Sequence, residues 1–96
     1  MLIDVSSVEE VGQAVRAIRK HSGIRQDDVA GVSHVFLRDL EHGKDTVRFG
    51  LVLKVLDELG IRMVLEVPES QALAVQRFLD VPTLKGRTRS LPKEGE

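Results

Sequence analysis

The chain has 96 residues and a mass of 10.7 kDa, which leaves room for one small domain and a tail, since most domains run from about 50 to about 200 residues. Fourteen Lys and Arg against 15 Asp and Glu give a formal net charge of −1, which excludes a protein that coats nucleic acid or membrane by bulk positive charge. Aromatic residues make up 3% and cysteine is absent, so neither a base-stacking platform nor a thiolate metal site is expected.

The apolar runs are only a few residues long, and the N-terminal stretch lacks the basic and apolar segments of a secretory signal. We therefore expect no membrane span and a cytoplasmic location.

The first expected helix covers roughly residues 7–22. Ser7 and Glu10 have the spacing of a capping box, in which a hydroxyl and a carboxylate each bind a free backbone N–H. Apolar residues follow at spacings of three and four, as on one face of an amphipathic helix. These residues are Val8, Val11, Val15 and Ile18. Gly23 supplies the end of the helix.

Two short helices are expected next, over residues 26–31 and from about 34 to 42. A turn that contains Gly31 and Ser33 separates them. Gly31 is free to adopt a positive φ, and Ser33 can cap the helix that follows. Two short helices joined by a tight glycine-containing turn are typical of a helix-turn-helix.

A fourth helix, capped by Asp45 or Thr46, is expected to run to Leu59 with a wide apolar face. Residues 61–67 then change period, and Pro68 ends the run. Alternating apolar residues predict a strand here. The residues on its apolar face are Ile61, Met63, Leu65 and Val67.

A lone strand cannot satisfy its own hydrogen-bonding ladder. We expect it to pair with the same strand of a second copy, which makes the protein a homodimer with these four apolar residues at the interface. The alternative is that it pairs with residues 2–5 of its own chain. Beyond Pro68 the pattern allows a short helix within residues 68–81, and residues 82–96 are polar and expected to be disordered.

The stretch from Gly31 to Lys44, GVSHVFLRDLEHGK, resembles the signature of lambda-repressor-like (XRE-type) helix-turn-helix proteins. Its continuation to Ile61, a helix followed at once by a single strand, is similar to the HipB-type antitoxin branch. The resemblance covers roughly residues 7–67. It implies a mainly α fold, a helix-turn-helix bundle of four to five helices with one C-terminal β-strand that pairs across a homodimer. Residues 1–67 would then be the DNA-binding domain.

HipB-like proteins repress their own operon and neutralise a HipA-type serine/threonine kinase toxin. The resemblance thus implies a sequence-specific repressor of a palindromic operator that is also the antitoxin of a type II toxin–antitoxin system. One departure is that the second helix is shorter than the family pattern by most of a turn. Two alternatives stay open: a protein-interaction module on this scaffold that does not bind DNA, and an ordinary repressor without a toxin partner.

In a helix-turn-helix the second of the two helices enters the major groove of DNA. The residues on the side away from Leu37 and Leu40 are expected to reach base edges, the alternative being solvated surface residues. These base-reading residues are Ser33, His34, Val35 and Arg38. Arg38 suits guanine O6 and N7, and Val35 suits a thymine methyl group.

Residues that flank this helix are expected to hold DNA phosphates. They are Arg25, Gln26, Lys44, Thr46 and Arg48. Gln26 resembles the polar residue that opens the second helix in the family, and Thr46 would act through the N–H groups at the start of the fourth helix. Glu41 is expected to be a structural carboxylate.

Enzyme classes are not supported by the pattern. Nothing in the spacing singles out a nucleophile with a nearby His and an orienting acid. The three His residues lack companions at metal-ligand spacing. We expect no catalytic residues, no metal site and no cofactor.

Overall fold

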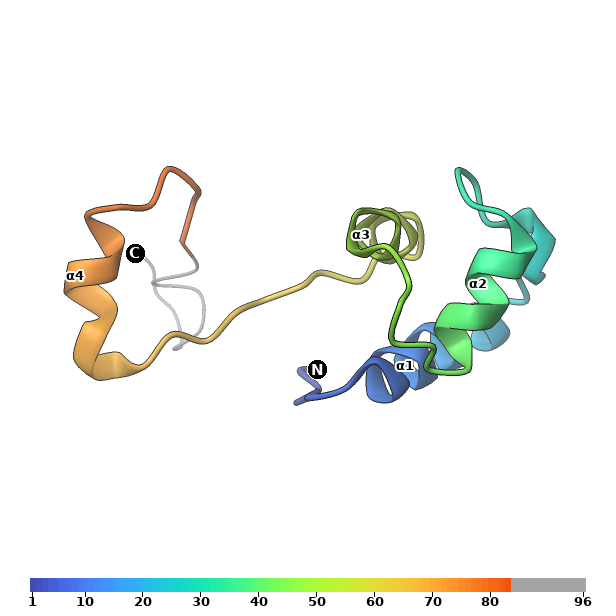
Figure 1. The fold of residues 1–96 in the computed structure, drawn as a ribbon, viewed down its shortest axis with the longest axis horizontal. Helices are drawn as coiled ribbons and strands as arrows, with labels where there is room; N and C mark the ends of the chain where they lie inside the picture. The colour runs from blue at the N-terminus through green and yellow to red at the C-terminus, as the bar shows by residue number, and fades with distance from the viewer. Residues whose placement is uncertain (84–96) are drawn as a thin grey trace. The chain divides into compact units, whose positions relative to one another are not determined.

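The computed structural model describes residues 1–83 (Figure 1). The chain divides into two compact units, Met1–Val64 and a second that begins at Leu65. The first unit holds helix α1 (Val8–His21), the 3-10 turn η1 (Gln26–Asp28), helix α2 (His34–Glu41) and helix α3 (Phe49–Glu58). α2 packs along α1, and α3 runs nearly along the line of sight in Figure 1.

The N-terminus of α1 is capped as its sequence predicts. The hydroxyl of Ser7 accepts the N–H of Glu10 at 3.1 Å. The Glu10 carboxylate accepts the N–H of Ser6 at 2.6 Å, one residue earlier than in a standard capping box. This N–H and the Ser6 hydroxyl hold the pKa of Glu10 below its ordinary value.

The second expected helix, over residues 26–31, is instead the single turn η1. Val29 leaves the helical conformation with φ −84° and ψ 117°, which points its side chain into the core. Gly31 then adopts φ +87°, a conformation that only glycine takes without strain. The burial of Val29 in this extended conformation therefore ends the helix after one turn.

α2 has the bounds and the cap that the sequence predicts. Ser33 is its N-cap, and the Ser33 hydroxyl accepts the N–H of Phe36 at 3.1 Å. α3 begins later than expected, at Phe49 rather than near Asp45 or Thr46. The reason is that the intervening residues form a turn that packs Val47 against the core.

The core of the first unit is made by apolar residues from all three helices and from η1's C-terminal flank. Its buried members are Val15, Val29, Leu37, Leu40, Val52, Val55 and Leu56. Eight half-buried apolar residues pack around them, Ile61 among them. The core therefore fixes the position of α2, whose opposite side is exposed.

No strand forms within residues 1–83, so the strand expected over 61–67 is unconfirmed, and pairing with residues 2–5 is not formed either. The segment after α3 is extended. The N–H of Ile61 donates to the carbonyl of Leu56 at 2.8 Å, and the Ile61 side chain packs against the core. Met63, Leu65 and Val67 are exposed by 41%, 83% and 40%.

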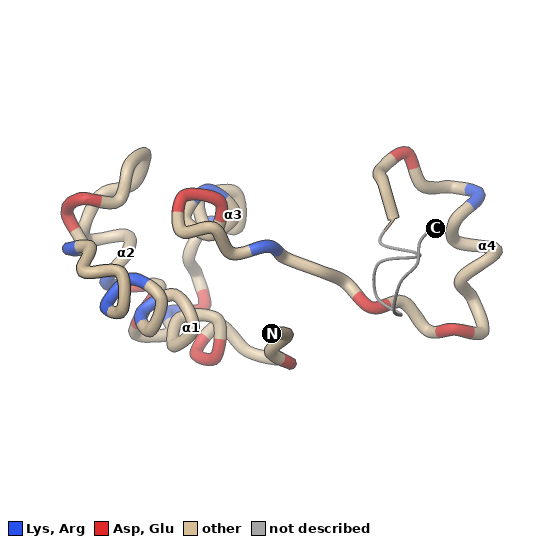
Figure 2. The backbone as a smooth tube through the Cα atoms, turned by 180° about the vertical axis from the view of Figure 1, so that it is seen from behind, with Lys and Arg blue, Asp and Glu red and all other residues tan. Residues whose placement is uncertain are grey.

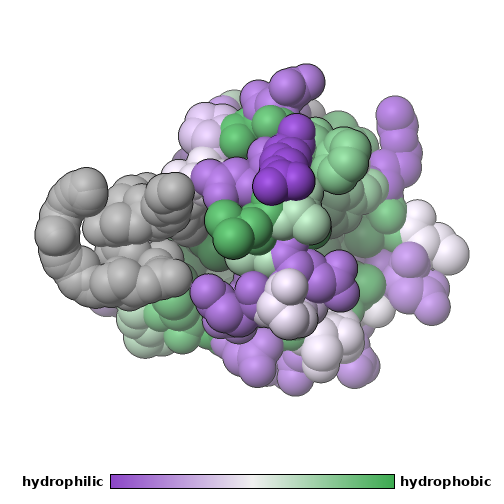
Figure 3. Space-filling model, turned by 90° about the vertical axis from the view of Figure 1, so that its left-hand side faces the viewer, coloured by the Kyte–Doolittle hydropathy of each residue, from purple (hydrophilic) through white to green (hydrophobic). Residues whose placement is uncertain are grey.

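The described part of the second unit holds the 3-10 turn η2 (Glu69–Gln71) and the short helix α4 (Ala72–Gln76). Four large apolar side chains in and after α4 are exposed: Leu73, Phe78, Leu79 and Val81. Figure 3 shows apolar side chains interspersed with hydrophilic ones on one face of the molecule. The tail expected over residues 82–96 lies outside the described residues from residue 84 onward. None of the described helices is long and apolar enough to cross a membrane.

Candidate nucleic-acid interface

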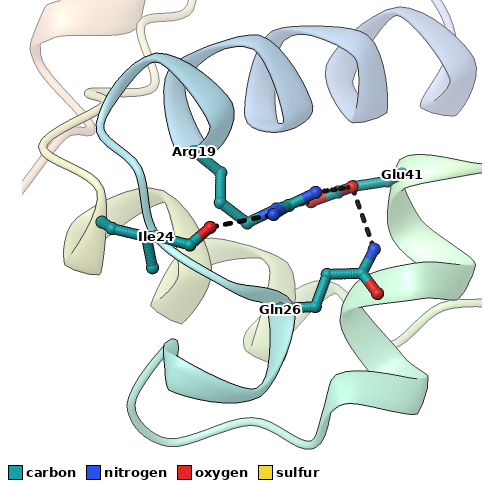
Figure 4. Close-up of polar contacts among 4 residues, drawn as sticks. All are labelled: Arg19, Ile24, Gln26 and Glu41. Carbon is teal, nitrogen blue, oxygen red and sulfur yellow. Dashed lines mark hydrogen bonds and ion pairs between the residues drawn. The ribbon is translucent and has the colours of Figure 1, made fainter.

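A buried ion pair joins α1 to the end of α2 (Figure 4). Two guanidinium nitrogens of Arg19 donate to the two carboxylate oxygens of Glu41, at 2.6 and 2.9 Å. The third donates to the carbonyl of Ile24 at 2.9 Å, and the Gln26 side-chain amide donates to Glu41 Oε1 at 3.1 Å. This cluster connects α1, the following loop, η1 and α2.

The Arg19 and Glu41 side chains are only 9% and 2% exposed. Burial by itself raises the pKa of the Glu41 carboxyl, but hydrogen bonds from Arg19 and Gln26 and the positive charges of Arg19 and Arg16 outweigh it and hold this pKa below its ordinary value. The bond to Glu41 raises the pKa of Arg19 in turn. Both groups stay ionised, and a bidentate charged pair of this kind fixes geometry as well as charge. Glu41 is therefore structural, as expected.

The four residues predicted to read bases lie along α2, from its N-cap Ser33 to Arg38 in its last turn. Ser33, His34, Val35 and Arg38 are all exposed, while Leu37 and Leu40 on the opposite side are fully buried. The structure thus presents these residues to solvent on a helix whose orientation the core and the Arg19–Glu41 pair determine.

The five residues predicted to hold phosphates differ in exposure and in their place in the fold. Lys44, Thr46, Arg48 and Arg25 are exposed, and Gln26 is half-buried. The amide of Gln26 is engaged by Glu41. Thr46 lies in a turn and not at a helix start; Arg48 is the residue that precedes α3. The backbone donors at this helix start therefore belong to the residues after Arg48, so the mechanism expected for Thr46 is corrected.

Carboxylates accompany two of the basic side chains. Arg25 lies 3.0 Å from Asp27 and 4.0 Å from Asp28, and Lys44 lies 3.6 Å from Asp39. Figure 2 shows Lys and Arg positions next to Asp and Glu positions along this part of the chain. The face is mixed in charge, which agrees with the formal net charge of −1.

An open hollow of about 390 Å³ lies beside the first turn of α2. It is lined by Arg19, Arg25, Gln26, Asp27 and His34. Four of these five residues carry hydrogen-bond donors, but Arg19 and Gln26 already donate to Glu41 and Ile24. Arg25 and His34 are the exposed donors of this polar lining.

A relative in Sinorhizobium fredii (strain NBRC 101917 / NGR234) decides the family. This protein, described as an uncharacterized HTH-type transcriptional regulator, y4mF, is 46% identical to the chain over 59 residues, which cover 58% of this chain and 78% of the relative. The chain belongs to the HTH-type transcriptional regulators. No family model matches the sequence.

The fold of this regulator is HipB-like. It matches the structure of a HipB-O4 20mer complex with a TM-score of 0.63 and 20% identity, over 71% of this chain and all of that one. A chain of a HipA-HipB-O2-O3 complex gives a TM-score of 0.64 and 20% identity over the same shares. The expected helix-turn-helix family is thereby confirmed by the relative, and the HipB-like fold by the solved structures. The chain is a regulator and not an enzyme.

Sequence reasoning missed the partner of Glu41 in this helix-turn-helix regulator. Arg19 has a simpler local explanation, because a positive charge in the last turn of α1 complements the negative end of the helix dipole. A further pattern was available: Arg19 follows Val15 by four residues and so lies on the apolar face of α1. Glu41 directly follows the buried Leu40. A charged residue on each of two apolar faces indicates a buried pair.

Proposed function

We propose that this regulator binds a palindromic operator as a homodimer, represses its own operon, and neutralises a HipA-type serine/threonine kinase toxin as the antitoxin of a type II system. The observation that carries the DNA-binding part is the exposed set Ser33, His34, Val35 and Arg38 on a rigidly mounted α2. In such a motif this helix reads base edges in the major groove.

In this proposal Arg38 pairs with a guanine and Val35 contacts a thymine methyl group. Arg25, Gln26, Lys44 and Arg48 approach phosphates on either side, Gln26 with the amide group that Glu41 positions. Thr46 would contribute its hydroxyl from the turn. These contacts set register and salt-dependent affinity, and the base contacts set sequence choice.

Dimerisation is proposed through residues 61–67 of each copy, within a DNA-binding domain that covers residues 1–67. The support is that Met63, Leu65 and Val67 are exposed apolar side chains on an extended segment, which is unusual for a chain that works alone. Ile61 would anchor the strand to the core of its own copy. Two copies of α2 would then meet half-sites about 34–36 Å apart.

The toxin partner is proposed from the fold alone. One matching structure is a complex of HipB with HipA and DNA, so this scaffold accommodates both partners in that protein. The exposed apolar residues of the second unit, Leu73, Phe78, Leu79 and Val81, are available for a protein contact.

Footprinting of the DNA upstream of the gene tests the operator. A protected palindrome that disappears with the Arg38→Ala variant supports the proposal, and the absence of protection contradicts it. Co-expression with a neighbouring kinase-like gene tests the antitoxin role. Rescue of growth and co-purification are expected, whereas an adjacent operon of another kind would favour an ordinary repressor.

A second candidate is an interaction module that does not bind DNA. It is favoured by the shortened η1 and by the ion pairs that Arg25 and Lys44 make with carboxylates of the same face. Salt dependence separates the two candidates. Phosphate contacts make the logarithm of affinity fall linearly with the logarithm of salt concentration, and a protein that fails to bind DNA at low salt is the interaction module.

A further inference from the structure

Asp27 is the one carboxylate among the five residues that line the hollow beside α2. Its neighbours there include the donors of Arg19, Arg25, Gln26 and His34. A DNA phosphate that bound Arg25 here would use the guanidinium group that already donates to Asp27. Asp27 therefore takes the place of a phosphate oxygen at Arg25.

Asp27 is paired with Arg25, which is the one positively charged residue among those proposed to bind phosphate that also lines the hollow. The Arg25 guanidinium donates to Asp27 Oδ2 at 3.0 Å, and Asp28 lies 4.0 Å from the same side chain. All three side chains are more than half exposed. An exposed pair of this kind is weak, but Asp27 is held two residues from Arg25 along the chain and competes with any phosphate that approaches it.

We propose that Asp27 competes with DNA phosphate for Arg25 and thereby lowers the affinity of the regulator for DNA. This inference rests on the proposed DNA-binding function. In the free protein Asp27 neutralises Arg25. In the complex the same pair persists, so Arg25 contributes little to phosphate binding. This loss acts twice in a homodimer.

Asp27→Asn removes the charge and keeps the shape of the side chain. The probe is a fluorescently labelled DNA duplex of arbitrary sequence, because phosphate contacts are independent of sequence. Asp57→Asn is the matched control: it makes the same change of charge on an exposed residue at the far end of α3 from Arg48. Thermal melts of each variant confirm that it is folded.

At low salt, Asp27→Asn should bind the duplex about tenfold more tightly than Asp57→Asn, since two weak competing ion pairs are removed per dimer. The slope of log affinity against log salt should steepen by about 1.8, or about 0.9 for each arginine that gains a phosphate. A general effect of net charge would instead give the two variants equal affinities.

Arg25→Gln completes a double-mutant cycle, which isolates the coupling between the two residues. This substitution should cost little affinity in the wild-type protein and about tenfold in the Asp27→Asn background. Equal costs in both backgrounds would overturn the inference and leave DNA binding intact. If neither the wild-type protein nor any variant binds the duplex at low salt, the proposed function is wrong and the inference falls with it.

Discussion

Gly12 of α1 lies directly against the backbone of Leu40 in α2: a methyl group built on Gly12 would overlap the Leu40 carbonyl oxygen and crowd the backbone of Glu41. The atoms that the methyl group would meet belong to the backbone, so the clash cannot be relieved by rotating a side chain. Gly12→Ala should therefore push α2 away from α1 and lower the free energy of unfolding by about 2 kcal/mol, as overpacking does. Urea denaturation monitored by circular dichroism measures the loss.

Gly50 provides the control for this substitution. It also lies in a helix, α3, but a methyl group there would meet nothing within 4 Å. Gly50→Ala should raise the free energy of unfolding by up to about 1 kcal/mol because alanine favours the helix. If both substitutions stabilise the protein, the result would contradict the close approach of α1 and α2 at Gly12.

Loss of the buried carboxylate of Glu41 should be costly. Glu41→Gln leaves Arg19 buried without its counter-charge, and such a change costs about 3 kcal/mol. Glu58→Gln, an exposed position on α3, should change the stability by less than about 0.5 kcal/mol. Urea denaturation of both variants at neutral pH measures the difference, and equal stabilities would contradict a structural role for the pair.

The same carboxylate predicts a pH dependence. The folded protein holds the pKa of Glu41 below its ordinary value of 4.5, so the ionised form stabilises the fold. This contribution is fully present at neutral pH. It is lost as the pH falls below 4.5 and through the lower folded pKa, because the unfolded chain takes up the proton first. Thermal melts across this range should show a shallower acid decline for Glu41→Gln than for the wild type.

The sequence predicted α1 and α2 well because residues close to each helix end determine where the helix begins and stops. Ser7 and Ser33 cap the two helices, and Gly23 and Gly43 end them with positive φ values. These are interactions within a few residues, so a single segment contains all the information that they need.

The sequence-based predictions are wrong or incomplete where tertiary contacts determine the bounds of a helix or the partner of a side chain. Val47 packs on the core, and α3 begins later than expected; Val29 is buried in the core in an extended conformation, and the second helix ends after one turn. The Arg19–Glu41 pair joins residues 22 positions apart and depends on how α1 packs against α2. Local propensity contains none of this information. The predicted strand needs a partner that the single chain does not supply within residues 1–83.

Arg38 should determine sequence choice, and Arg48 only affinity. Arg38→Ala removes the one side chain of the base-reading set that suits guanine, so discrimination at one base pair of each half-site should fall by about 1–3 kcal/mol. Arg48→Ala should weaken binding to all sequences alike and reduce the salt slope by about 1 for each lost contact. Competition binding between the operator identified by footprinting and duplexes with single-base changes measures both effects. A uniform loss with Arg38→Ala would remove it from the base-reading set.

The strand proposed over residues 61–67 is tested by proline. In a two-stranded ladder successive N–H groups point to opposite edges, so one of Met63 and Val64 must donate to the partner copy. Proline has no N–H. One of the two variants Met63→Pro and Val64→Pro should therefore be monomeric, with the helical signal of the first unit retained because both side chains are exposed.

Alanine at each position keeps the N–H and is the matched control, so Met63→Ala and Val64→Ala should stay dimeric. Light scattering coupled to size-exclusion chromatography gives the mass of each variant. The monomeric proline variant should also lose operator binding, because a single half-site offers half of the contacts and the affinities of linked sites multiply. Two dimeric proline variants would show that the copies associate through another surface, and a monomeric wild type would contradict the homodimer itself.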